Sequence, residues 1–150
     1  MKSMQSIAAT NALWQQAGLV APRNGVANLV FFQVRGDCPA PGIQDGDVLF
    51  ATWCPMPICQ ARLDGDELAV FLVQDAGTGS VSVLLKRWRG MLVGDNESRG
   101  ATVQLADEGE VLAFPASWVH LVANHVRLAQ RGWLYHSDLL AGVVHSGLDL

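Results

Sequence analysis

Charged residues are scarce in this chain. They make up only 16% of its 150 positions, whereas half of all residues are apolar. Disordered proteins combine low hydrophobicity with high net charge, so this composition excludes general disorder and indicates a folded protein. A chain of this length fits one domain and can bury a sizeable hydrophobic core.

Basic residues are scarcer than acidic ones. The chain has ten lysines and arginines against fourteen aspartates and glutamates, and its formal net charge is −4. The densest basic group is small, consisting of Lys86, Arg87 and Arg89. Proteins that bind duplex nucleic acid gain most of their affinity by neutralising phosphates with a basic face. We therefore expect no direct nucleic-acid binding by this chain alone.

The sequence also lacks long apolar runs, and it has too few cysteines to pair all of them in disulfides. No run reaches the roughly 18 to 20 apolar residues that a membrane-spanning helix needs, and residues 1–11 are too polar for the core of a secretion signal. Three cysteines are an odd number, which fits a reducing compartment. We expect a cytoplasmic protein with no membrane partner.

Short apolar segments separated by turn residues run through most of the chain. They are rich in β-branched and aromatic residues, which is typical of strands. The expected strands are 29–35, 47–52, 67–73, 80–88, 91–93, 101–105, 110–114 and 119–128. Such regular spacing favours a mainly β, mostly antiparallel fold over alternating strands and helices. Helical spacing occurs over residues 3–17, which predicts a short N-terminal helix ended by Gly18.

This pattern divides the chain into three parts. Residues 1–28 form an N-terminal arm and linker, and residues 29–128 form the β domain. Residues 129–150 are a C-terminal tail that packs on the domain or extends it. The turn residues Pro22 and Gly25 mark the linker.

Cys38 and Lys86 are the candidates for chemistry. Cys38 follows a strand in a turn rich in glycine and proline, a common placement for a small nucleophile. Lys86 follows the apolar segment Val81–Leu85, so its side chain either extends to water at the strand end or is buried. Burial disfavours the charged form of a lysine, and a neutral amine can act as a general base. Taken alone, each residue is better explained without chemistry, Cys38 as a free cysteine in a loop and Lys86 as a lysine that extends to water at a strand end.

Several separated blocks, in the right order, resemble the self-cleaving peptidase domain of the LexA/UmuD family, which shares its fold with the signal peptidases. The blocks are Gly36-Asp37-Cys38, Pro41-x-Ile43, Asp45-Gly46-Asp47, Gly65-Asp66, Lys86-Arg87 and Leu92-x-x-x-Asn96. The resemblance implies a twisted antiparallel β fold and a catalytic pair, with Cys38 at the position of the family's serine and Lys86 as its base. Serine–lysine pairs are a known form of such nucleophilic sites.

The chain departs from the family pattern beside the nucleophile. Pro39 replaces the usual methionine and has no backbone N–H to offer an oxyanion. A cysteine thiolate is favoured by a nearby ammonium, but an ammonium paired with a thiolate is no longer a free base. The resemblance therefore leaves two functions open. One is a regulatory protein in phage, plasmid or SOS-type control that cleaves itself through a Cys–Lys dyad, and the other is a dead domain acting as a dimeric protein-binding module.

The resemblance also implies a cleavage site and partners. Members of the family cut their own linker, usually at Ala-Gly or Cys-Gly, and Ala17-Gly18 is such a pair. They pair through C-terminal β segments, so we expect a homodimer with apolar residues of 119–128 at or beside the interface. A repressor, a recombinase filament or a polymerase would be the protein partner. Residues 1–28 are too few for the DNA-binding helix-turn-helix of the family's repressors.

A zinc site is the alternative for the remaining cysteines and histidines. Cys54 with Cys59 and His120 with His125 form two candidate ligand pairs. The pairs are roughly sixty residues apart, and structural zinc sites use tighter spacing within each pair. On a regular strand His120 and His125 would face opposite sides. We expect no metal and no other cofactor.

Overall fold

The computed structural model describes residues 12–21, 29–36, 42–92, 102–107, 110–129 and 140–145. Most of these residues lie in strands, and residues 12–16 form a short helix. The mainly β fold with a short N-terminal helix is thus confirmed. No helix within the described ranges is long and apolar enough to cross a membrane.

The strands follow the expected order with two differences in extent. They are β1 Leu29–Arg35, β2 Val48–Pro57, β3 Leu68–Gln74, β4 Val81–Leu92, β5 Thr102–Asp107, β6 Glu110–Pro115, β7 Val119–Leu128 and β8 Leu140–His145, with short 3-10 turns at Ile58–Gln60 and Ala116–Trp118. The expectation of a turn at Arg89-Gly90 was wrong, because β4 continues through a register shift between Trp88 and Met91. The loop expected from Cys54 to Gly65 begins later than predicted, because β2 continues to Pro57 through an irregularity in its pairing with β7 that accommodates Pro55.

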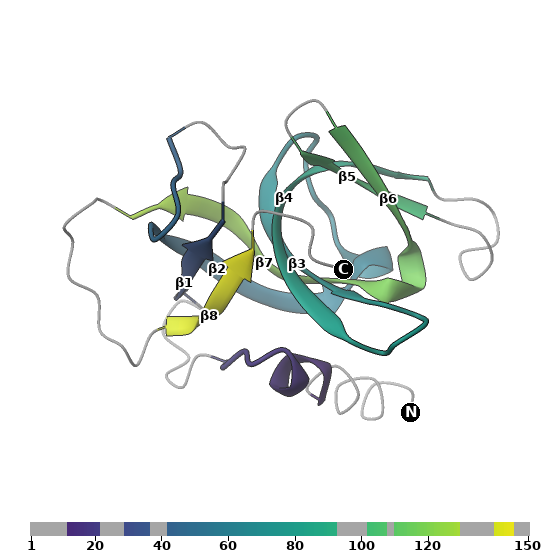
Figure 1. Cartoon of the computed structure of the whole chain (residues 1–150). Helices are drawn as coiled ribbons and strands as arrows, with labels where there is room; N and C mark the ends of the chain where they lie inside the picture. The colour runs from purple at the N-terminus through teal and green to yellow at the C-terminus, as the bar shows by residue number, and fades with distance from the viewer. Residues whose placement is uncertain are drawn as a thin grey trace.

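The eight described strands form one sheet that closes on itself (Figure 1). Their order is β3-β7-β2-β1-β8-β4-β5-β6, and an additional pairing between β3 and β4 joins the first strand to the sixth. Neighbouring strands are antiparallel except at β8, which runs parallel to β1 and to β4. The β5–β6 hairpin extends the sheet beyond the closed part.

Strand β8 brings part of the expected tail, residues 140–145, into the wall of the closed sheet. It lies between β1 and β4 and follows β1 over most of its length. Its described pairing with β4 is limited to one position, Leu84 with His145. The described part of the sheet therefore has little strand pairing between β4 and β8.

Alternating side chains divide the buried residues into two cores. The inner core fills the closed sheet and includes Val30, Phe32, Val34, Leu49, Ala51, Val70, Leu72, Val83, Leu85 and Val144. The outer core lies on the other face of β3 and β4, and it includes Ala69, Phe71, Val73, Leu84, Trp88, Val103, Leu105 and Phe114. Along β4, residues 83 and 85 belong to the inner core, whereas 84 and 88 belong to the outer one, as the two-residue period of a strand requires.

The N-terminal helix packs on the inner core through Trp14. The Trp14 ring meets that of Trp53 edge to face, with centroids 5.2 Å apart. Leu19 is also buried, and the next residue, Val20, donates its N–H to the Ala141 carbonyl over 2.8 Å. Residues of the expected arm therefore pack against the same core as the strands.

Candidate active site around Lys86

Lys86 is buried in the outer core. Its exposed fraction is 1%, and it lies opposite Ala69 in the pairing of β4 with β3. Leu84 and Trp88 flank it on the same face of β4. The sequence left open whether the Lys86 side chain extends to water or is buried, and the structure shows that it is buried.

Asp107 supplies a counter-charge for this lysine. The Lys86 Nζ donates a hydrogen bond to Asp107 Oδ2 and forms an ion pair with it. Asp107 is the last residue of β5, and its side chain is 19% exposed. Its other oxygen, Oδ1, is buried and accepts no hydrogen bond from any described residue. A buried charge is strongly destabilising without such a partner, so the pair makes burial of the ammonium tolerable.

Sequence reasoning missed Asp107. An aspartate at the end of a short strand is typical of a turn residue, and nothing in its neighbourhood marks it as a partner of Lys86. The two residues are 21 positions apart. Their contact depends on the antiparallel pairing of β4 with β5, in which Arg87 lies opposite Ala106.

The turn at residues 42–47 forms hydrogen bonds to the end of β1. The N–H of Gly36 donates to Asp45 Oδ1 over 2.8 Å. The N–H of Val34 donates to the Asp47 carbonyl, and Gly46 donates back to Val34. Gly36 and Gly46 have φ angles of 90° and 88°, a conformation that favours glycine. The Asp45-Gly46-Asp47 block therefore fixes how the chain leaves β1.

The register of three parallel strands places the end of β1 level with Leu84, two residues before Lys86. Arg35 on β1 and Leu84 on β4 both pair with His145, which lies between them. Because neighbouring strands are ~4.8 Å apart, β1 and β4 lie roughly 10 Å from each other at this level. Lys86 lies two residues beyond Leu84, in the direction in which the chain leaves Arg35. Cys38 itself lies outside the described residues, as do Asp37, Pro39, Pro41 and Asn96.

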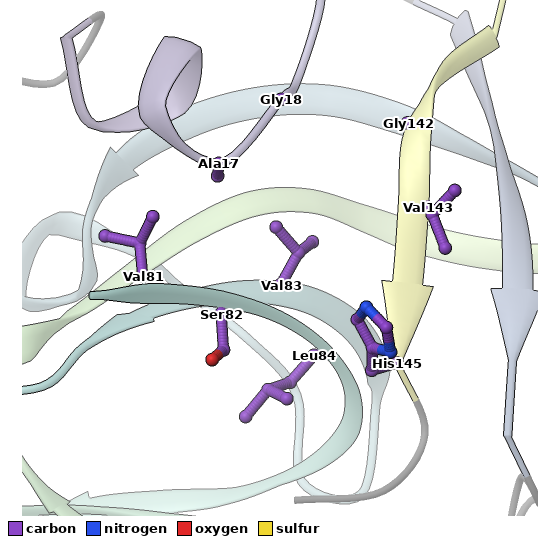
Figure 2. Close-up of a pocket in the computed structure, with 9 residues that line it drawn as sticks. All are labelled: Ala17, Gly18, Val81, Ser82, Val83, Leu84, Gly142, Val143 and His145. Atoms are coloured by element: carbon purple, nitrogen blue, oxygen red, sulfur yellow. The ribbon is translucent and has the colours of Figure 1, made fainter. Parts of the chain in front are cut away.

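The expected cleavage pair, Ala17-Gly18, lies at one end of a cavity of about 380 Å³ between β4 and β8 (Figure 2). The cavity lining is completed by Val81, Ser82, Val83, Leu84, Gly142, Val143 and His145. A Cβ on Gly142 would lie 2.6 Å from the Leu19 side chain, so glycine permits the close approach of this segment. Lys86 lies five positions beyond Val81 on β4, which is about 16 Å at 3.3 Å per residue. The structure therefore does not bring Ala17-Gly18 together with Lys86.

The other cysteines and histidines do not gather around one point. Cys54 and Cys59 are free thiols, and no group of three or more metal-ligating side chains occurs in the described part of the chain. Burial raises the pKa of the Cys54 thiol to about 11, against a smaller lowering by the Asn124 backbone. Burial also lowers the pKa of His120. His125 is mostly exposed, and its Nδ1 lies 3.2 Å from Glu67 Oε1.

Comparison with known proteins identifies no relative of this chain. No protein-family model, curated protein or solved structure matches it. The candidate site is therefore defined by its own residues: a buried lysine, its aspartate partner, and the end of a strand that leads to a cysteine.

Proposed function

We propose that this chain is a cytoplasmic, LexA/UmuD-like regulatory protein that cleaves itself through Cys38 and Lys86 in phage, plasmid or SOS-type control. One observation carries the proposal. Lys86 is a charged residue with 1% exposure, and it lies on a strand that is level with the end of β1, from which the chain continues to Cys38. Lysine is almost never fully buried in a folded protein unless it is paired, so its placement here is unusual for this residue type.

The proposed chemistry divides amide cleavage into two steps. The Cys38 thiol gives its proton to the neutral Lys86 amine, and the thiolate attacks the carbonyl carbon of the scissile bond. A C–S bond forms, the C–N bond breaks, and the Lys86 ammonium returns the proton to the leaving amine. Water then hydrolyses the thioester and regenerates the thiol.

The position of Ala17-Gly18 sets a condition on this reaction. Segment 17–20 is held beside β8 by the Val20–Ala141 hydrogen bond and by Leu19. For cleavage within one chain, this segment must leave its place and move about 16 Å along β4, at 3.3 Å per residue. Cleavage between two copies avoids that movement.

Self-cleavage is tested by intact-mass measurement after long incubation at neutral and alkaline pH. We expect wild-type protein to lose residues 1–17 increasingly toward alkaline pH, since Lys86 must give up its proton before it can accept another. Cys38→Ala and Lys86→Met should stay whole, whereas Cys54→Ala should cleave like wild type. Cleavage that persists in Cys38→Ala, or an intact wild-type chain at every pH, would contradict the proposal.

A non-catalytic binding module is the second candidate, and the Lys86–Asp107 pair favours it. This pair gives the charge of Lys86 a partner within the outer core. Under this candidate the chain acts as a dimer that binds a repressor, a recombinase filament or a polymerase.

The dimer is common to both candidates, and residues 119–123 of the expected interface are largely occupied within the chain itself. Val119, Leu121, Val122 and Ala123 are buried in the chain's own cores, and β7 is paired on both sides. The terminal strand of the described sheet is β6, where Val111 is exposed. We expect light scattering at micromolar concentration to report the mass of two chains, and Val111→Lys to lower it. A mass of one chain for wild type would rule out the dimer at that concentration.

A further inference from the structure

The cavity between β4 and β8 lies where the pairing of these two strands is interrupted (Figure 2). The strands run parallel and pair at Leu84 with His145, but Ser82 and Val143, which a regular ladder would pair next, line the cavity instead. Its volume of about 380 Å³ lies within the ~300 to 1,000 Å³ of typical ligand sites. We infer that this cavity binds a short, uncharged segment of another protein, which adds to the sheet as an extended strand between β4 and β8.

Backbone groups of β4 face this cavity. The Trp88 N–H donates to the Glu67 carbonyl, so the even-numbered residues of β4 direct their backbone groups toward β3. Because this direction alternates along a strand, the N–H and C=O groups of Val81 and Val83 point the other way, toward β8. The Val83 carbonyl is used where β4 and β8 pair. The Val83 N–H and both groups of Val81 are therefore directed at the cavity.

The facing strand, β8, is arranged in the same way. The Val34 N–H donates to the Asp47 carbonyl, so Val34 is turned toward β2 and its neighbour Gln33 is turned toward β8. In a parallel ladder a residue bonds to the two neighbours of its partner, and the partner of Gln33 is Val143. The Val143 N–H and C=O therefore point away from β1 and into the cavity. A strand placed there would find donors and acceptors on both sides.

The N-terminal segment shows that β8 can bond to a further stretch of extended chain beside this cavity. The Val20 N–H donates to the Ala141 carbonyl over 2.8 Å. The adjacent Leu19 packs against Gly142, where a Cβ would lie only 2.6 Å from the Leu19 side chain. Edges with directed N–H and C=O groups are the surfaces to which proteins add extended peptides. The occupant we infer continues, along β8, a type of contact that the chain already makes.

The lining of the cavity limits the chemistry of the occupant. Among the described residues that line it, none is an aspartate, glutamate, lysine or arginine, and the polar side chains are those of Ser82 and His145. A charged side chain or a free chain end would lose hydration there without gaining a counter-charge. The remaining lining residues are small or apolar. The occupant is therefore an internal segment with small, uncharged side chains.

Binding is tested by NMR titration of the full chain, labelled with nitrogen-15, with a tripeptide of alanine, valine and alanine that is capped at both ends. We expect saturable binding, the largest shifts at the Val83 and Val143 N–H groups, and slower hydrogen exchange at both. Methylation of the central peptide nitrogen should weaken binding by about tenfold, the effect of one lost hydrogen bond. A central lysine should weaken it by at least about tenfold.

A pair of variants on the N-terminal segment tests the location of the site. The Ala17 side chain points toward Val81 and Val83 (Figure 2), so Ala17→Phe should fill the cavity and lower peptide affinity by about tenfold or more. Gln15 is exposed and does not line the cavity, so Gln15→Phe should bind the peptide like wild type. If Ala17→Phe does not fold, the comparison of the peptides on wild type still decides.

The site contains neither Cys38 nor Lys86, so the inference does not rest on the proposed reaction. Intact mass confirms that the chain stays whole during the titration. Absence of saturable binding, equal binding of the methylated or lysine peptide, or shifts confined to other parts of the chain would each overturn the inference. If the Val83 and Val143 signals instead shift with protein concentration when no peptide is present, the occupant is a second copy of this chain and the inference is wrong.

Discussion

Replacing Trp14 by alanine should lower the free energy of unfolding by about 3 to 5 kcal/mol. Trp14 belongs to the short helix before the β domain, yet its ring is buried in the inner core against Trp53. Truncation removes a large apolar side chain and leaves a cavity that the closed sheet cannot easily collapse to fill. Urea denaturation measures the effect. It would be a large share of the roughly 5 to 15 kcal/mol that stabilises a typical domain.

Trp14→Phe is the matched control for this prediction. The Trp14 Nε1 is buried and donates to no described acceptor, so phenylalanine removes an unsatisfied polar group while keeping an aromatic ring. We expect a loss of only about 1 kcal/mol. Val20→Ala, at an exposed position nearby, should change stability by about 0.5 kcal/mol or less. A loss below about 1 kcal/mol for Trp14→Ala would mean that the helix does not belong to the cooperative core.

The positions of most strands could be predicted from the sequence, because turn residues separate apolar segments that alternate between two faces. The closure of the sheet could not. It depends on β8, whose residues Leu140–His145 are short and lie in a segment with no clear pattern, and on a β3–β4 pairing that closes the ring. The continuation of β4 through Gly90 was also hidden, since an Arg-Gly pair in a sequence is as typical of a turn as of a strand irregularity.

Only part of the candidate site could be predicted from the sequence. Lys86 stood out because it follows a run of apolar residues, and its burial agrees with one of the two readings. Asp107 did not stand out, because its role depends on a contact between strands that are distant in sequence. The resemblance to the LexA/UmuD family contributed Cys38 and Ala17-Gly18, and the structure places the latter pair away from Lys86, beside the start of β4.

Lys86 should control the reactivity of Cys38. The thiolate is the form that reacts with alkylating reagents, and a nearby ammonium favours it. Lys86→Met keeps the length of the side chain and removes the charge, so we expect alkylation of Cys38 near neutral pH to slow by about tenfold, which corresponds to one unit of thiol pKa. Arg87→Met, which removes the neighbouring charge, should leave the rate at Cys38 unchanged.

The rate of Cys38 alkylation in wild type and Lys86→Met, resolved for each cysteine by peptide mass spectrometry, tests most directly whether the two residues form one site. Cys54 provides an internal reference, because burial raises its pKa to about 11 and its alkylation should rise only toward that pH in both proteins. Cys59, which is exposed, gives the rate of an accessible thiol. We predict that Cys38 in wild type reacts faster than Cys59 near neutral pH and loses this advantage in Lys86→Met. Equal Cys38 rates in the two proteins would show that Lys86 does not act on Cys38, and the proposed site would then be wrong.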